Sequence, residues 1–363
     1  MTEKRTTISD VAREAGVSKA TVSAVLNDKG TVNETTRDRV LEVIERLNYR
    51  PSSQPRRSRS GRNKSIGLLI KEAHNPFYAE IITAARGRAN AEGYTLLVAS
   101  SEGDYESERR IFELLRAKDV DGLLVNPVFD ADADLSPLFE LKRRNFPLVL
   151  LEEIRGVRAS LVDIDNVEAA RRATTHLIDL GHTRIAHFTG PRYSMQTEQR
   201  ASGMRRAFSE SSLILQDELL IPTGARLEDG HRTGLEFFGQ APKESRPTAV
   251  LCYNDLVAIG LMRALHELDL HVPDDVSVVG HDDIDLLNYL PIGLTTVRIP
   301  KRDMAEMATE LLIRHIESRE ALAPRKILID TELVVRESTR SLGADPSVSA
   351  RGRAAAASAR RAR

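Results

Sequence analysis

The sequence has one cysteine, no tryptophan and no long apolar run in its 363 residues. Because Cys252 has no second cysteine to pair with, a disulfide framework is excluded, and with it most small secreted scaffolds. No apolar stretch approaches the roughly 20 residues that a membrane-spanning helix needs. The first five residues are polar and lead into no apolar segment, so we expect no secretory signal. These absences predict a soluble, cytoplasmic protein with no membrane association.

The short motifs that mark common catalytic and nucleotide-binding sites are also missing. The sequence contains no G-x-x-x-x-G-K-S/T, G-x-G-x-x-G, H-E-x-x-H or G-x-S-x-G segment. Its nine histidines show no metal-ligand spacing, and we interpret His182 and His187 as structural residues. Asp163 and Asp165 alternate on a predicted strand, which offers little basis for catalysis. We therefore expect no enzymatic activity, no metal ion and no cofactor.

The net charge of −1 hides an uneven distribution of charge along the chain. Residues 1–65 carry a net charge of +6 and residues 344–363 a net charge of +4, whereas residues 66–343 carry −11. A basic segment attached to an acidic remainder favours binding of a polyanion by the basic segment. A solvated surface without a partner would produce the same division, so charge leaves both interpretations open.

Two short helices are predicted near the N-terminus. Thr7 and Asp10 have the spacing of a capping box, and Gly16 offers a stop for the helix that they begin. Ser18 can then cap a second helix that runs to Asn27. Two short helices joined by a tight turn that contains glycine form a helix-turn-helix.

A third helix is predicted to begin near Asn33. The spacing of Val40, Ile44 and Leu47 predicts that these side chains are buried on one helix face. The geometry alone leaves open a small three-helix bundle with no role in DNA binding.

The segment TISDVAREAGVSKATVSAVLN, followed by VNETTRDRVLEVIERLNYRP, resembles the DNA-binding head of the lactose-repressor (LacI/GalR) family over residues 6–51. The resemblance implies that the second helix enters the major groove, with Lys19, Ala20 and Ala24 at the base-reading positions. Many members place Arg or His where this chain has Ala24, although alanine can still pack on a thymine methyl group. Further residues would contact phosphates or orient the helix: Thr7, Ser18, Thr21, Ser23, Asn27, Thr31, Asn33 and Tyr49.

The basic linker at residues 51–62 departs from the family pattern. The resemblance implies a hinge helix that forms on DNA and inserts a leucine between base steps of the minor groove. Here Ser58 stands at the leucine position and Pro55 at an alanine position. Because serine is no apolar wedge, we expect the linker to bind mainly phosphates, with Ser52, Arg56 and Ser58 in contact with DNA. A merely flexible basic linker is the alternative for the unbound protein.

From Ile66 onward, short apolar runs alternate with amphipathic helical patterns. Strands are predicted at 66–70, 95–100, 122–126, 147–151, 160–164, 184–190, 248–254 and 277–283, and helices at 77–92, 105–117, 166–180, 197–211, 255–268 and 301–318. This alternation predicts parallel sheets with helices on both faces. Two series of strands predict two lobes, with a small ligand in the cleft between them.

The family resemblance extends through this region to Arg340, in runs such as DNVEAARRATTHLIDLGHTRIAHFTGP and VSVVGHDD. It implies a periplasmic-binding-protein-like fold with three crossovers between the lobes. We therefore predict an α/β protein with a helix-turn-helix, three-helix head and a two-lobed body with parallel sheets. The expected boundaries are a head at 1–51, a hinge at 52–64, a body at 65–341 and a disordered tail, rich in Ala and Arg, at 342–363. Within the body, the first lobe would comprise 65–165 and 296–325, and the second 166–295 and 326–341.

Polar residues at the predicted strand ends are candidates for contact with an effector. Arg200 matches the family's ligand-clamping arginine, and a guanidinium suits hydroxyl or carboxylate groups. An aspartate beside an asparagine can bind vicinal hydroxyls, which favours a sugar-like ligand. The full set is Phe77 as an apolar platform, with Glu152, Arg200, Asn254, Asp255 and Asp282 as polar contacts. Each has a structural alternative, such as a loop carboxylate or a helix cap. Ile299 and Ala225 depart from the family pattern, so no particular member's effector transfers to this chain.

These features predict a transcriptional repressor that binds double-stranded DNA as a homodimer at a pseudo-palindromic operator. A small-molecule effector, expected to be a carbohydrate, would control its operator affinity. One rival is a solute-binding protein of a transport system, which would need an export signal and no DNA-binding head. Another is a hydrolase on a similar scaffold, which would need convergent acid/base or metal-binding groups.

Overall fold

The computed structural model of the chain describes residues 6–26, 32–47, 49, 63–117, 120–128, 135–192, 194–318 and 322–343. The chain divides into two compact units, residues 1–61 and residues 62–363, which we call the head and the body. Five residues that were predicted to contact DNA lie outside the described residues, as does the expected tail from residue 344 onward: Asn27, Thr31, Ser52, Arg56 and Ser58.

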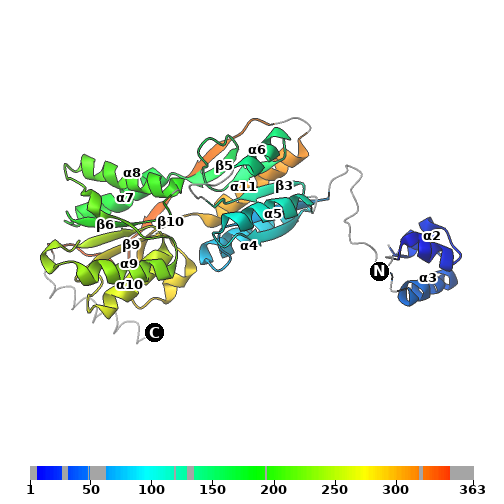
Figure 1. Ribbon diagram of the computed structural model, residues 1–363, viewed down its shortest axis with the longest axis horizontal. Helices are drawn as coiled ribbons and strands as arrows, with labels where there is room; N and C mark the ends of the chain where they lie inside the picture. Colours follow the sequence, from blue (N-terminus) through cyan, green and yellow to red (C-terminus); the bar gives the residue numbers. More distant parts are fainter. Residues whose placement is uncertain are drawn as a thin grey trace. The chain divides into compact units, whose positions relative to one another are not determined.

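The head contains the three predicted helices, α1 (Ile8–Glu14), α2 (Lys19–Leu26) and α3 (Glu34–Arg46) (Figure 1). A small apolar core lies between them, and it is dominated by valines. On α3 the buried residues are Val40 and Val43, whereas Ile44 and Leu47 pack against the core only partly buried. The buried face of α3 therefore differs from the predicted one. Val40 and Val43, rather than Ile44 and Leu47, lie at the centre of the core of the head.

The helix ends of the head are capped as the sequence predicted. Thr7 accepts from the backbone N–H of Asp10, whose carboxylate accepts in return from the backbone N–H of Thr7 at 2.9 Å. Gly16 has a φ of +64°, a left-handed conformation that glycine adopts without a steric penalty. Ser18 accepts from the backbone N–H of Thr21 at 3.1 Å, and Asn33 caps α3.

The first lobe of the body is built on a six-stranded parallel sheet with the order β11-β5-β4-β3-β1-β2. Its strands are β1 (Ser65–Ile70), β2 (Thr95–Ser100), β3 (Gly122–Val125), β4 (Leu148–Leu150), β5 (Ser160–Ile164) and β11 (Lys326–Ile329). The central strands are buried on both faces, which explains why they appear in the sequence as continuous apolar runs.

The second lobe has a six-stranded sheet with the order β12-β10-β9-β8-β6-β7, in which only the pairing of β12 with β10 is antiparallel. Its strands are β6 (Ile185–Thr189), β7 (Leu220–Pro222), β8 (Ala249–Cys252), β9 (Ser277–Asp282), β10 (Thr295–Arg298) and β12 (Glu332–Val334). The fold class predicted from the alternating pattern is thus confirmed.

Helices cover both faces of each sheet (Figure 1). In the first lobe these are α4 (Pro76–Ala91), α5 (Tyr105–Ala117), α6 (Ser136–Arg143) and α11 (Lys301–Glu317). In the second lobe they are α7 (Asn166–Asp179), α8 (Met195–Glu210), α9 (Leu227–Gln240) and α10 (Asp255–Glu267), with short 3-10 turns at Asp217–Leu219, Lys243–Ser245 and Asp285–Tyr289. The pairs α4–α11, α7–α8 and α9–α10 pack against each other.

Helices α6 and α9 were not among the predicted helices. The sequence of α9, LEDGHRTGLEFFGQ, contains three glycines, which lower its helix propensity. Two of these glycines allow close packing on α10, because a Cβ atom at Gly230 would lie 2.2 Å from the carbonyl oxygen of Val257. Tertiary packing therefore stabilises a helix that the local sequence does not favour.

The chain crosses between the lobes three times, after β5, after β10 and after β11. Two expected lobe boundaries are wrong. Strand β10 pairs with β9 and belongs to the second lobe, not the first, and β11 pairs with β5 and belongs to the first lobe, not the second. Both strands are short. Their few apolar residues do not indicate which of the two sheets each strand joins.

The edges of the body also extend slightly beyond the expected limits. The backbone N–H of Asn63 donates to Asp121 at 3.1 Å, and Lys64 pairs with Glu317 at 3.0 Å, so these two hinge residues belong to the body. At the other end, the backbone N–H of Leu342 donates to the carbonyl of Leu180 at 2.9 Å. Within the described residues, no helix is both long and apolar enough to cross a membrane.

Candidate effector site and DNA-binding head

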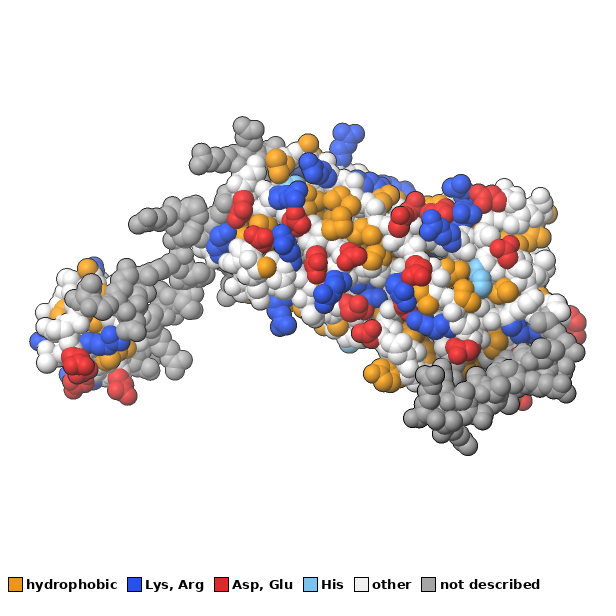
Figure 2. Space-filling view, turned by 180° about the vertical axis from the view of Figure 1, so that it is seen from behind, with side chains coloured by type: hydrophobic (Ala, Val, Ile, Leu, Met, Phe, Trp, Pro, Cys, Tyr) orange, Lys and Arg blue, Asp and Glu red, His pale blue; other side chains and the backbone are white. Residues whose placement is uncertain are grey.

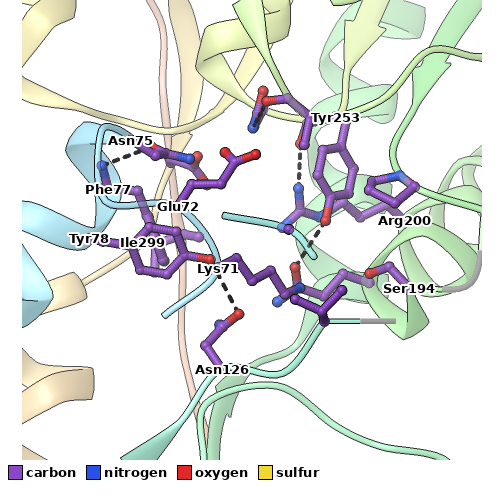
Figure 3. A pocket seen from close by; sticks show the side chains of 17 residues that line it. Lys71, Glu72, Asn75, Phe77, Tyr78, Asn126, Ser194, Arg200, Tyr253 and Ile299 are labelled. Carbon is purple, nitrogen blue, oxygen red and sulfur yellow. Dashed lines mark hydrogen bonds between the residues drawn. The ribbon is translucent and has the colours of Figure 1, made fainter. Parts of the chain in front are cut away.

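A cavity of about 160 Å³ lies between the two lobes, at the carboxyl ends of their strands. Figure 3 shows side chains from both lobes converging on it. Four of the six predicted effector residues line it: Phe77, Arg200, Asn254 and Asp282. Residues far apart in the sequence are therefore brought to one place, as parallel sheets with a cleft between them predict.

Arg200 lies on α8 and is almost fully buried in the cavity wall. Its Nε donates to Asn166 at 3.1 Å, and one terminal nitrogen donates to the backbone carbonyl of Tyr253 (Figure 3). The guanidinium carbon lies 4.6 Å from the centre of the Tyr253 ring. These contacts fix the orientation of the guanidinium before any ligand arrives.

Asp282 ends strand β9 and has a φ of +121°, a conformation that is rare for a residue with a side chain. The ammonium of Lys301 donates to the carbonyl oxygen of Asp282 at 2.7 Å and helps to hold this backbone. Burial raises the pKa of the Asp282 carboxyl to about 7, although Arg200 and Lys301 act in the opposite direction. The side chain is therefore a hydrogen-bonding group whose charge changes near neutral pH.

Asn254 and Asp255 follow strand β8 but have different roles. Asn254 caps α10 by accepting from the N–H of Val257 at 2.9 Å, and its amide donates to the carbonyl of Ala225 at 2.8 Å. Asp255 lies behind the cavity wall, where it accepts from the Thr296 hydroxyl at 2.6 Å and from a backbone N–H. Asp255 is therefore not among the residues that line the cavity, and its lone pairs hold strand β10 in place. Its contact with the effector stays a prediction.

Glu152 also lies behind the wall rather than on it, and its contact with the effector likewise stays a prediction. Its fully buried carboxylate accepts from Lys71 of the same lobe and from the hydroxyl of Ser194 of the other lobe, at 2.8 Å. Burial alone would lower the pKa of Lys71, but the charge and hydrogen bond of Glu152 raise it above its usual value. Lys71 and Ser194 line the cavity, so Glu152 positions two of its wall residues.

Sequence reasoning missed several residues of the first-lobe wall. These include Lys71 and Glu72, which directly follow β1, and Asn126, which directly follows β3. The Tyr78 hydroxyl donates to Asn126 at 3.2 Å, and the ring of Tyr78 packs edge-on against Phe77 with centroids 5.2 Å apart. Their position at the carboxyl ends of strands was the signal that could have identified them.

Two buried carboxylates near the cavity also have perturbed pKa values. Burial raises the pKa of Glu108 to about 7 and that of Asp163 to about 7. Asp165 instead caps α7 by accepting from the N–H of Glu168 at 2.9 Å, so Asp163 and Asp165 do not share a site. His182 contacts Thr248 and the carbonyl of Arg340, which fits its structural interpretation.

The DNA-binding residues of the head that the structure describes lie mainly on α2 and at helix ends. Val22 and Val25 bury one face of α2, whereas Lys19 and Ala20 at its start are exposed. The other described candidates are exposed or partly exposed: Thr7, Ser18, Thr21, Ser23, Ala24, Asn33 and Tyr49. Their contact with DNA stays a prediction.

Comparison with known proteins identifies the family. The family described as "Bacterial regulatory proteins, lacI family" matches residues 7–52, and a "Periplasmic binding protein-like domain" matches residues 174–339. The HTH-type transcriptional repressor PurR of Vibrio vulnificus is 35% identical over 339 residues, which cover 93% of this chain and 99% of the relative. The ribose operon repressor of Halalkalibacterium halodurans is 35% identical over 337 residues, covering 92% of this chain and 97% of the relative.

Solved structures agree with this assignment. The complex of the transcriptional regulator CelR with cellobiose is 29% identical with a TM-score of 0.69, over 92% of this chain and all of the other. The lac repressor dimer bound to operator and the anti-inducer ONPF is 25% identical with a TM-score of 0.71, over 93% of this chain and all of the other. The chain thus belongs to the lacI family of bacterial regulatory proteins, whose members are DNA-binding repressors under small-molecule control.

Proposed function

We propose that this repressor responds to a neutral, polyhydroxylated effector of monosaccharide size, which binds in the cavity between the lobes. The observation that carries the proposal is the lining of that cavity. Carboxylate, amide and guanidinium groups alternate there with the apolar side chains of Phe77, Val128 and Ile299. A sugar ring has hydroxyl groups around its edge and C–H groups on its faces, and both find partners in such a lining.

The size of the cavity favours a monosaccharide. Its volume is about 160 Å³. Pockets for drug-sized ligands are larger, at roughly 300–1,000 Å³. The ribose operon repressor among the relatives is named for a pentose, whereas the CelR structure contains a disaccharide. The present cavity fits the smaller of these two ligand classes.

The charges around the cavity favour a neutral ligand. Lys71 is paired with Glu152, and Glu72 is paired with Arg226 at 2.8 Å. The carboxylate of Asp282 stands in the field of Arg200. Lys71 and Arg226 already have acidic partners, and Arg200 already donates to Asn166 and to the carbonyl of Tyr253. A phosphate or carboxylate on the ligand would therefore gain little from the site.

We further propose that a homodimer in the cytoplasm binds operator DNA through two heads and that no catalytic step is involved. The exposed residues at the start of α2 support insertion of this helix into the major groove. On the face of the body shown in Figure 2, acidic and basic side chains are interspersed and form no continuous basic surface. This distribution supports a division of labour in which the head holds DNA and the body holds the effector.

The proposal is tested by calorimetry on the full chain with D-ribose, D-glucose, D-glucose 6-phosphate and cellobiose. A mobility-shift assay then measures operator affinity with and without each sugar. Its DNA duplex is obtained by selecting, from random sequences, those that the protein binds. We expect at least one monosaccharide to bind and to change operator affinity. Tighter binding of the sugar phosphate or of cellobiose, or no binding by any of the four, would contradict the proposal.

A further inference from the structure

An ion pair between Arg226 and Glu72 joins the two lobes at the rim of the cavity, and a second pair, Arg155 with Glu198 at 2.6 Å, also joins them. The Nε of Arg226, from the second lobe, donates to the Glu72 carboxylate of the first lobe at 2.8 Å. A terminal nitrogen of the same guanidinium donates to the carbonyl oxygen of Glu102 at 3.0 Å. Glu72, Gly103 and Ala225 line the cavity, whereas the Arg226 side chain is 45% exposed. The guanidinium therefore lies on the outer side of the lining.

On the first-lobe side of this contact, the two loops that carry the partners of Arg226 are joined to each other. Glu72 and Glu102 belong to two loops that follow β1 and β2, and these loops are tied together by two hydrogen bonds. The N–H of Ala73 donates to the Glu102 carboxylate at 3.1 Å, and the N–H of Gly103 donates to the carbonyl of Lys71 at 2.8 Å. A displacement of the loop after β1 or of the loop after β2 should therefore move both loops.

The second-lobe half is equally anchored. The N–H of Arg226 donates to Asp229 in the first turn of α9 at 3.1 Å, and the carbonyl of the preceding Ala225 accepts from Asn254 at 2.8 Å. Helix α9 itself is packed closely on α10. The backbone at both ends of the Arg226–Glu72 pair is therefore tied to its own lobe.

From this arrangement we propose that Arg226 and Glu72 form a latch that determines which effectors the cavity accepts. The latch holds the two rims together and thereby keeps the cavity at monosaccharide size, which retains a bound monosaccharide and excludes longer ligands. This inference rests on the proposed function of the cavity. Arg226 does not contact the ligand in this scheme and acts as a positioning residue.

The test compares Arg226→Gln with Arg226→Lys and with a control elsewhere in the second lobe. The control is Arg206→Gln, which removes an exposed arginine that pairs with Glu210 of its own helix, α8, at 2.8 Å. Calorimetry on the full chain measures the affinities for D-ribose, D-glucose and cellobiose at low and high salt.

We expect Arg226→Gln to lower the monosaccharide affinity about fivefold, the scale of one partly exposed ion pair. We also expect it to lower the ratio of monosaccharide to cellobiose affinity and to remove the salt dependence of monosaccharide binding. Arg226→Lys should restore part of each effect, since an ammonium can replace only the contact with Glu72.

A second measurement needs no ligand. Spin labels at Glu113→Cys on α5 and Glu236→Cys on α9 report the distance between the lobes, and the buried Cys252 is shielded from labelling. Arg226→Gln should lengthen or broaden this distance distribution, and Arg206→Gln should leave it unchanged. Identical distributions and an unchanged affinity ratio in Arg226→Gln would overturn the latch. If no sugar binds at all, the proposed function fails, while the distance measurement still decides whether the latch exists.

Discussion

At the scale of single residues, the cavity contains polar side chains whose orientation is already fixed. Arg200 is held by Asn166 and by the carbonyl of Tyr253, and Asp282 is held in an unusual backbone conformation. Fixed groups of this kind improve affinity because little side-chain entropy is lost when the ligand binds. The same contacts mean that a substitution at Arg200 affects stability as well as binding.

Replacing Arg200 should therefore have two measurable effects. Arg200→Gln removes charge-assisted hydrogen bonds of about 1.5–3 kcal/mol each, so we expect monosaccharide affinity to fall at least tenfold in calorimetry. We also expect the free energy of unfolding in urea to fall by about 1–3 kcal/mol, because buried acceptors lose their donor. The matched control is Arg205→Gln on the same helix, where the Arg205 side chain is 54% exposed. Effector affinity unchanged in Arg200→Gln would remove Arg200 from the site.

The charge of Asp282 should make effector binding depend on pH. Because burial raises its pKa to about 7, the carboxyl is largely protonated at pH 6 and largely ionised at pH 8. The ionised form accepts stronger hydrogen bonds from sugar hydroxyls, so affinity should rise from pH 6 to pH 8. Calorimetry at both pH values should show this rise in the wild type and a much smaller one in Asp282→Asn.

The raised pKa of Asp282 also predicts the direction in which the free energy of unfolding changes with pH. An unfolded aspartate releases its proton near pH 4, whereas folded Asp282 keeps it until about pH 7. Between these values the native state binds more protons, so the Asp282 contribution to the free energy of unfolding falls as pH rises. The difference in stability between Asp282→Asn and the wild type should therefore shift in favour of the variant from pH 5 to pH 8. A difference that does not vary with pH would contradict the raised pKa.

At the scale of secondary-structure elements, close helix contacts determine where glycine is required. Helix α9 has three glycines in different surroundings. A Cβ atom at Gly230 would meet the carbonyl oxygen of Val257 at 2.2 Å, whereas one at Gly239 would meet only a side-chain carbon of Leu268 at 3.9 Å. The first position demands glycine for packing, and the second does not.

This contrast gives a matched pair of substitutions within one helix. Gly230→Ala should destabilise the protein by about 1–3 kcal/mol, because the added methyl group pushes α9 away from α10. Gly239→Ala should leave the stability unchanged or raise it by up to about 1 kcal/mol through better helix propensity. Urea denaturation of both variants would check this, and equal effects would show that α9 and α10 are not packed as described.

The elements also show what could be predicted from the sequence and what could not. Central strands such as β1 are almost entirely apolar, so a continuous apolar run identifies them. Strands β10 and β11 are short, and their sheet membership depends on contacts with β9 and β5 that no local pattern records. In the site, Arg200 and Asp282 were found through strand ends and the family motif. Glu152 and Asp255 also follow strands, but they bond to other protein groups behind the wall, and the sequence does not reveal which side of the wall a side chain occupies.

At the scale of the whole molecule, charge and contacts divide the chain near residue 61. Residues 1–65 carry a net charge of +6 and residues 66–343 a net charge of −11, and the two compact units meet between Gly61 and Arg62. An acidic body adds nothing to the attraction for phosphates, so the head should provide nearly all of the DNA affinity.

A shortened chain of residues 62–363 should therefore bind the effector and not the operator. Its contacts at Asn63 and Lys64 are retained, so the body should keep its thermal stability and its monosaccharide affinity in calorimetry. Operator binding in a mobility-shift assay at moderate salt should disappear. A shift of operator DNA by residues 62–363 would disprove this division between head and body.

The repeated crossing of the chain between lobes has a consequence for synthesis on the ribosome. The third helix of the head ends at Arg46, so the head can fold while most of the chain has not yet been made. The first lobe, in contrast, lacks α11 until residue 317 and its edge strand β11 until residue 329. During that interval the apolar face of α4 that α11 later covers stays exposed to water and to other nascent chains. Chaperone binding to the nascent protein should therefore be greatest late in translation and should end when the last thirty or so residues emerge.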